Sequence, residues 1–226
     1  MIGTLKMEKI DLIVATRNRR EKLLKMLGSL PTWTQMFDTK YYLDVKIICD
    51  GDQETYDFLK DNPCYNVELI ENHIGSVACR NMLCGAVNDG LLYATDDIVF
   101  ESGSIEAAFD MFNRFFPDDD GVVGFVQNQS FHPTGVALVG QKFLQRHKSK
   151  CLFFPGYYHF AAQEIYNHAM RLDKFVQCQD AKVFHYHPCF MKDQHDQTHE
   201  DARLHKGEDM QLKKQREAAG LIWGID

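Results

Sequence analysis

Long apolar runs, internal repeats and clustered cysteines are all missing from this chain of 226 residues. No stretch of about eighteen apolar residues occurs, so the sequence predicts no membrane-spanning helix. Residues 1–14 contain a short apolar run but no small-residue cleavage site, so a signal peptide is not expected. Neither a repeat nor a low-complexity segment is found, which speaks against solenoid and disordered architectures.

The seven cysteines are an odd number and form no CxxC pair. Neither a disulfide framework nor a cysteine-based zinc site is therefore indicated. Five of the cysteines lie in or beside apolar segments, namely Cys49, Cys79, Cys84, Cys151 and Cys178. We expect them to be reduced core thiols, and the protein to be cytoplasmic.

Positive charge is also in short supply. Lys and Arg number 25 against 32 Asp and Glu, which gives a formal net charge of −7. A general nucleic-acid-binding protein needs a basic surface, so that class is disfavoured, although Arg17, Arg19 and Arg20 form a small basic patch. With 45% hydrophobic and 25% charged residues, the composition is that of a globular protein with one large domain.

In the first half of the chain, short apolar runs alternate with amphipathic stretches. The runs predict strands over residues 10–15, 45–49, 67–70 and 91–94. Helices are predicted over residues 21–30 and 77–90, with Gly90 closing the second one as a C-cap. This alternation indicates βαβ units and a mostly parallel sheet.

The second half has a different pattern. Strands are predicted over residues 121–126, 135–140, 175–178 and 181–187, and a helix over residues 161–172. A polar helical segment follows over residues 197–219. Loops are expected over residues 38–42 and 148–159.

Each of the first four predicted strands ends in polar side chains. These are Thr16-Arg17-Asn18, Asp50-Gly51-Asp52, Glu71-Asn72 and Thr95-Asp96-Asp97. Ligands of open α/β sheets bind outside the carboxyl ends of the parallel strands. Although loops are polar in general, four polar ends at one edge predict a site for a polar, charged ligand.

The sharpest local signal is the pair Asp96-Asp97, which directly follows a buried strand. Two adjacent carboxylates repel one another unless a cation lies between them. Mg²⁺ and Mn²⁺ take carboxylate oxygens and are often completed by substrate phosphates. The alternative is that the pair caps a helix. The acidic run Asp118 to Asp120 lies between Pro117 and Gly121, which is turn chemistry, and is given no function.

Four strings occur in order along the chain: DLIVATRNRREKLLKMLGSL, IICDGD, VELIENHIGSVACRNMLCGAV and LLYATDDIVFESGSIEAAFDMF. Together they resemble glycosyltransferase family 2 and its GT-A-fold relatives, from about residue 10 to 116 and more loosely to about 187. The resemblance implies an α/β GT-A fold, a Rossmann-like sheet flanked by helices, with a C-terminal helical tail. The domain would span residues 1–190, divided into a nucleotide-binding half (1–100) and an acceptor half (101–190). The tail would be residues 191–226.

The resemblance also implies site residues. Those expected to hold the nucleotide sugar are Ala15, Thr16, Arg17, Asp50, Arg80, Asn81 and Asp96, with Asp50 on the base or ribose. Asp97 falls on the position of the direct metal ligand. For Arg80 a structural ion pair is the alternative.

Two histidines, His185 and His187, lie two apart on a predicted strand and so project from the same face. Related enzymes have a histidine at the end of a late strand beside the metal. A His ligand would favour Mn²⁺ over Mg²⁺, since imidazole is a softer donor than carboxylate. We expect at least one of the two to be structural instead.

A catalytic base is harder to find. Relatives carry an acidic pair or Asp-x-Glu at the start of the late helix, where this chain has Ala161, Ala162, Gln163 and then Glu164. Glu164 is therefore the candidate base, and a glutamate favoured by the helix dipole is the alternative. In the tail, His195 and His199 have metal-chelating spacing but no further partner, so we expect solvated histidines on a lid or acceptor loop.

The implied function is metal-dependent transfer of a sugar from a nucleotide-diphosphate donor, a UDP-sugar first, to an acceptor hydroxyl. The acceptor can be a saccharide, a lipid-linked sugar, a protein or a modified nucleic-acid base. A sugar-1-phosphate nucleotidyltransferase would need a glycine-rich first loop, which ATRNRR is not. The remaining alternative is a non-catalytic nucleotide- or partner-binding module, which Ala162 supports.

Overall fold

The computed structural model describes residues 9–31, 41–84, 88–128, 133–148, 151–159, 162–186 and 196–225. Its strands are β1 (Lys9–Thr16), β2 (Tyr42–Asp50), β3 (Tyr65–Ile70), β4 (Gly90–Tyr93), β5 (Ile98–Phe100), β6 (Val122–Gln127), β7 (Ala137–Gly140) and β8 (Phe175–His185). Its helices are α1 (Arg20–Leu27), α3 (Gln53–Leu59), α4 (Ser76–Leu83), α5 (Ser104–Phe115), α6 (Gln141–Leu144), α7 (Ala162–Arg171) and α8 (Gln197–Ala218).

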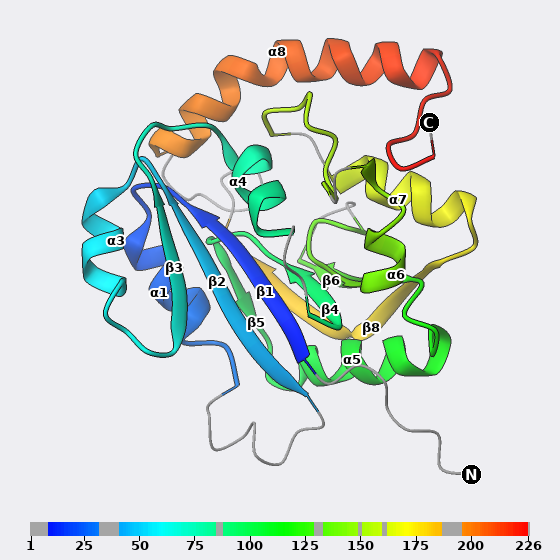
Figure 1. Cartoon of the computed structure of the whole chain (residues 1–226), viewed down its shortest axis with the longest axis horizontal. Coiled ribbons are helices and arrows are strands. Elements are labelled where there is room, and N and C mark those ends of the chain that lie inside the picture. Colours follow the sequence, from blue (N-terminus) through cyan, green and yellow to red (C-terminus); the bar gives the residue numbers. More distant parts are fainter. Residues whose placement is uncertain are drawn as a thin grey trace.

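One curled sheet runs through both halves of the chain, in the order β3-β2-β1-β4-β7-β6-β8-β5 (Figure 1). Strands β3, β2, β1 and β4 are parallel, so their carboxyl ends lie at one edge. Antiparallel pairs occur at β4–β7, β6–β7 and β5–β8. The observed architecture confirms the predicted α/β class and a mixed, mostly parallel sheet flanked by helices.

Two hydrophobic clusters fill the two faces of the sheet. Successive residues of β1 alternate between them: Leu12 and Val14 belong to the cluster that contains α1 and α5, and Ile13 to the cluster that contains α4, α6 and α7. Each of these three side chains is fully buried. Burial on both faces explains why the strand reads as a continuous apolar run instead of an alternating one.

Helix α8 lies outside these layers, across the edge of the molecule next to α4 and α7 (Figure 1). Only Asp209 and Arg216 are buried along its 22 residues. Its Leu212 packs against the α4–α7 cluster from outside. The predicted domain boundary at residues 190–191 lies outside the described residues, so the division into a domain and a tail stays a prediction.

The predicted strands of the first half are confirmed, but Gly90 is not a helix C-cap. Helix α4 ends at Leu83, and Gly90 is the first residue of β4, paired with Ile10 and Gly140. The two residues before Gly90 already contact β1. The backbone and side-chain amides of Asn88 donate to Asp11, and the backbone N–H of Lys9 donates to Asp89.

Two strands predicted over residues 175–187 are one strand, β8, with a register shift opposite Phe125 and Val126. Tyr42, expected in a loop, begins β2. Helices α3 and α5 were not predicted from the sequence.

The cysteines in the described part of the chain are free thiols, and four of them are buried: Cys49, Cys79, Cys84 and Cys178. The prediction of core thiols is confirmed for these four, whereas Cys151 is only partly buried. The cytoplasmic location stays a prediction. Within the same residues, no helix is long and apolar enough to cross a membrane.

Candidate donor site at the carboxyl edge of the sheet

Asp96 and Asp97 lie just beyond the end of β4, and each is only 4% exposed. The hydroxyl of Thr16, at the end of β1, donates to Asp96 Oδ2 over 2.8 Å. His185, at the end of β8, places Nε2 3.1 Å from Asp97 Oδ1. Three strand ends from separate parts of the sequence therefore converge on this acidic pair.

The two carboxyl groups have opposite pKa shifts. Burial raises the pKa of Asp96, and the charge of Asp97 adds to this against the opposing effect of Arg19. Burial acts in the same direction on Asp97, but the hydrogen bond and charge of His185, together with Arg19, outweigh it and hold the Asp97 pKa below its usual range. Asp97 is therefore the carboxylate that stays ionised, as a metal ligand must.

Arg19 lies at the centre of this edge. Its Nη1 is 3.1 Å from Asp96 Oδ1 and 3.4 Å from Asp97 Oδ2. Its Nε and Nη2 donate to the two carboxylate oxygens of Asp196, at 2.7 and 2.8 Å. Nη2 also contacts the imidazole of His199. One buried guanidinium thus joins the acidic pair to the first turn of α8.

The predicted basic patch is not a free cationic surface. Arg17 is paired with Asp201 of α8, and Arg20 with Glu54 at 2.8 Å. The tail histidine His199, expected to be solvated, has a side chain that is only 8% exposed and lies 2.8 Å from Asp196. The expectation failed because α8 closes over the first loop, which buries this turn.

Asp50 lies at the end of β2, as predicted, and is 3% exposed. Its carboxylate accepts from the backbone N–H groups of Ile74 and Gly75 at 2.9 and 3.0 Å. It also lies 2.6 Å from His73 Nδ1. Asp50 therefore fixes the turn before α4 in this structure, and its contact with a base or ribose stays a prediction.

Arg80 and Asn81 follow on α4 and differ in what they contact. The Asn81 amide donates to the carbonyl of Phe153 and accepts from its N–H, at 2.8 and 3.0 Å. Arg80 lies over the Phe153 ring, and its buried Nε has no hydrogen-bond partner among the described residues. Burial lowers the Arg80 pKa against the raising effects of Tyr93, Asp96 and Asp97. The Nε–H of Arg80 is a buried donor without an acceptor, and an anionic ligand bound beside Asp96 and Asp97 could supply that acceptor.

Glu164, the predicted base, is buried at the start of α7 and uses both of its oxygens. Oε1 accepts from the Tyr157 hydroxyl and from Arg216 Nε, each at 2.7 Å. Oε2 accepts from Arg216 Nη2 at 2.9 Å and from the backbone N–H of Trp223 at 2.7 Å. Burial acts to raise the Glu164 pKa, but these bonds outweigh it and lower it. The geometry gives no support to a role as a base.

The remaining predicted residues are placed as follows. Ala15 is half-buried near the end of β1. His187 lies outside the described residues. The structure adds three side chains at the start of α8 that were not predicted: Asp196, Thr198 and Asp201. They contact Arg17 and Arg19, and the basic string that contains these two arginines was the one sequence signal at this place.

Asp97 and His185 offer a carboxylate oxygen and an imidazole nitrogen, which are donors that Mn²⁺ accepts. Their Oδ1 and Nε2 atoms lie 3.1 Å apart as an ion pair in this structure. In the part of the chain that the structure describes, no third His, Cys, Asp or Glu joins them to form a metal cluster. Mg²⁺ and Mn²⁺ commonly complete such a sparse set with water and substrate phosphates.

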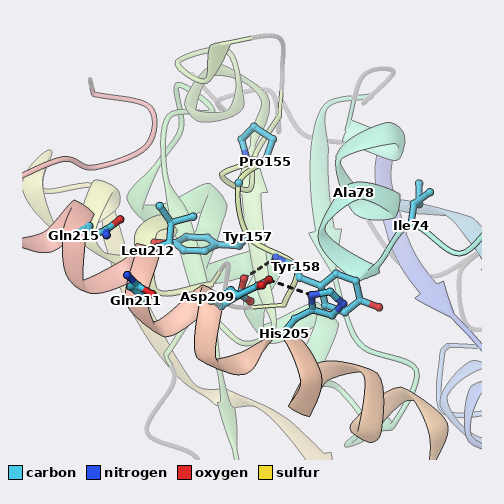
Figure 2. Close-up of a pocket in the computed structure, with 12 residues that line it drawn as sticks. Ile74, Ala78, Pro155, Tyr157, Tyr158, His205, Asp209, Gln211, Leu212 and Gln215 are labelled. Atoms are coloured by element: carbon cyan, nitrogen blue, oxygen red, sulfur yellow. Dashed lines mark hydrogen bonds and ion pairs between the residues drawn. The ribbon is translucent and has the colours of Figure 1, made fainter.

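A cavity of about 490 Å³ lies beside this edge, between α4, the 155–158 loop and α8 (Figure 2). Asp209 of α8 holds the loop, since its carboxylate accepts from the N–H groups of Tyr158 and His159 at 2.9 and 2.8 Å. The Tyr158 ring stacks on His205 at a centroid distance of 3.8 Å. The middle of α8 is therefore fixed to the body through one loop.

No protein-family model matches the sequence, and no curated protein matches it. Solved structures are similar in fold. The mannosyltransferase PcManGT from Pyrobaculum calidifontis, in complex with GDP-Man and Mn²⁺, superposes with a TM-score of 0.60 at 13% identity, over 79% of this chain and 56% of that one. TarS 1–349 from S. aureus gives 0.59 at 12% identity, over 78% and 60%.

GalNAc-T7 with UDP, GalNAc and Mn²⁺ gives a TM-score of 0.61 at 10% identity, over 79% of this chain and 44% of that one. This chain therefore spans about half the length of the structures it resembles. Together the likenesses show that the protein has the GT-A fold of nucleotide-sugar glycosyltransferases. At these identities they show the fold alone.

Proposed function

We propose that the protein is a divalent-metal-dependent glycosyltransferase that moves a sugar from a nucleotide-diphosphate donor, a UDP-sugar first, to an acceptor hydroxyl. The observation that carries the proposal is the pair Asp97 and His185, 3.1 Å apart beside Asp96 at the carboxyl edge of the sheet. The complexes of PcManGT and GalNAc-T7 with Mn²⁺ and a nucleotide or nucleotide sugar support it by analogy of fold.

In this proposal Asp97 and His185 hold Mn²⁺ or Mg²⁺, with His187 as a further candidate ligand. Asp96, kept in place by Thr16, faces the ribose or the sugar. The residues on the nucleoside side are Ala15, Thr16, Arg17, Asp50 and Asn81. The acceptor stays open among a saccharide, a lipid-linked sugar, a protein and a modified nucleic-acid base.

The chemistry places negative charge on the β-phosphate oxygen as the glycosidic bond breaks. A bound divalent ion supplies Lewis-acid stabilisation of that charge. Arg80 would donate its unsatisfied Nε–H to the same diphosphate. The contact with Phe153 holds the Arg80 side chain in place, and its buried Nε–H would have to become accessible for this bond to form.

A second candidate is a module of the same fold that binds a nucleotide without catalysis. The four hydrogen bonds on Glu164 favour it, because they leave the predicted base without a free lone pair directed at the site. Proton transfer from an acceptor needs a base within hydrogen-bond reach.

Hydrolysis of UDP-sugars and GDP-sugars in the presence of Mn²⁺ tests the proposal. We expect slow hydrolysis by the wild-type protein and at least a hundredfold loss in Asp97→Asn, which removes the ligand charge but keeps its size. Asp118→Asn is the matched control, because Asp118 is exposed and its ion pairs within the described part of the chain are with Lys142 and Lys174. Donor binding without hydrolysis or transfer would favour the non-catalytic module.

A further inference from the structure

The first turn of α8 is fastened to the loop and helix that follow β1 by opposite charges. Asp196 binds Arg19 through both oxygens and lies 3.2 Å from Lys22 Nζ. Asp201 pairs with Arg17. These contacts join segments about 180 residues apart in the sequence, and Thr198 Oγ1 adds a bond of 3.1 Å to the carbonyl of Arg17.

The contacts are partly buried, which gives them more weight than ordinary surface pairs. The side chain of Arg19 is 6% exposed, that of Asp201 14% and that of Asp196 26%. Exposed pairs contribute little because water screens them, whereas removing one partner of a buried pair leaves an uncompensated charge. No apolar side chain of this turn is buried, so its ion pairs are the main contacts that attach it to the body of the protein.

Arg19 also belongs to the proposed donor site. The same guanidinium that binds Asp196 lies 3.1 and 3.4 Å from the carboxylates of Asp96 and Asp97. A divalent cation on Asp97 would repel it at short range, and a diphosphate would offer it new anionic partners. Donor loading and the present position of Arg19 therefore compete.

We propose that the first turn of α8, through Asp196 and Asp201, is an autoinhibitory latch that Arg17 and Arg19 hold closed over the proposed donor site. Binding of a divalent metal and a nucleoside diphosphate draws Arg19 away from Asp196 and releases the turn. The inference rests on the proposed function, because it takes the nucleotide to be the competing ligand. The free energy needed to open the latch reduces the apparent affinity for the donor, since only the open fraction can bind.

The double substitution Asp196→Asn with Asp201→Asn separates the latch from the helix itself. Asn is as good an N-cap as Asp, so the bond from Asp196 to the N–H of His199 can be kept while both charges are lost. Glu200→Gln is the matched control, because it removes one charge from the same turn, and among the described residues Glu200 pairs with Arg203 of the same helix.

Hydrogen exchange and calorimetry on the full chain give two readouts, with UDP and Mn²⁺ as the probe. Without ligand, we expect backbone exchange over residues 199–203 to rise about tenfold in the double variant and to stay unchanged in the control. We expect the affinity for UDP with Mn²⁺ to rise about three- to tenfold in the double variant only. In the wild-type protein, UDP with Mn²⁺ should itself raise exchange in the turn.

Unchanged exchange in the ligand-free double variant would overturn the latch whatever the nucleotide does. Weaker nucleotide binding in that variant would also overturn it, because Asp196 and Asp201 would then belong to the binding site. If exchange rises as expected but neither UDP nor GDP binds to either protein, the proposed function fails, and the competition fails with it. The contact itself would still be established by the exchange result.

Discussion

The two ends of α8 are held to the body of the protein by different chemistry. At its first turn, charged side chains pair with the loop after β1, and each pair keeps some exposure. At its last turn, Arg216 and Glu164 form a buried pair that is completed by Tyr157 and Trp223. The last turn of α8 is therefore the firmly anchored end, and the first turn is the end that can be released.

The anchored end carries features that would be costly to break. Arg216 lies over the Phe154 ring at 3.7 Å, and the indole of Trp223 donates to the carbonyl of Cys151 at 2.8 Å. Behind it, His147 and His168 form a buried pair 3.2 Å apart. Gly224 packs directly against this pair, and a Cβ at this position would collide with both imidazole rings. The first turn of α8, by contrast, has no fully buried residue.

Removing Glu164 should have the largest effect on stability. Glu164→Ala leaves Arg216 buried without its partner, and we expect unfolding in urea to show a loss of about 3–5 kcal/mol. The same measurement on the Asp196→Asn, Asp201→Asn variant should show a smaller loss, because Arg19 keeps Asp96 and Asp97 as partners when Asp196 loses its charge. Equal losses in the two proteins would show that both ends of α8 are held equally strongly.

Glu164→Gln distinguishes a structural role of Glu164 from a role as the catalytic base. If Glu164 is an anchor, the variant should lose stability and keep donor hydrolysis per folded molecule. A variant of wild-type stability whose transfer rate falls by about 10²–10⁴ would instead restore Glu164 as the base.

Acid should weaken the anchored end over a defined range. Burial, with the charge of His168 adding to it, lowers the pKa of His147 from 6.5 to about 4. Below pH 6.5 the unfolded chain therefore takes up a proton that the folded protein refuses until about pH 4. Stability should fall by about 2–3 kcal/mol as the pH drops through this range. Urea unfolding at several pH values checks this, with His147→Gln, which cannot titrate, as the control expected to flatten the dependence.

The fold was predictable where local sequence decides the structure. The runs from Leu12 to Ala15 and from Ile47 to Cys49 are continuously apolar because both faces of the parallel strands are covered, which makes such strands easy to recognise. Gly90 was misplaced because a polar Asn-Asp-Gly string is typical of a helix end. Here the string pairs with β1 instead, a long-range contact that local pattern does not reveal.

The candidate site was predictable only in part, for a similar reason. Asp96 and Asp97 follow a strand directly, so their place at the sheet edge could be inferred. One partner of Arg19, Asp196, lies 177 residues away in the sequence. Two partners of Glu164, Arg216 and Trp223, lie 52 and 59 residues away. A first-turn glutamate looks the same in the sequence whether it faces an acceptor or a buried arginine.

Calorimetric titration with UDP and with GDP, in the presence and absence of Mn²⁺, decides whether Asp97 holds a metal ion that binds the nucleotide. We expect nucleotide binding that depends on Mn²⁺ in the wild-type protein. We expect Asp97→Ala to abolish this dependence and to leave the protein folded, although at a lower urea midpoint, because the buried Asp97 pairs with His185 and Arg19. Unchanged Mn²⁺-dependent binding in a folded Asp97→Ala variant would contradict this expectation.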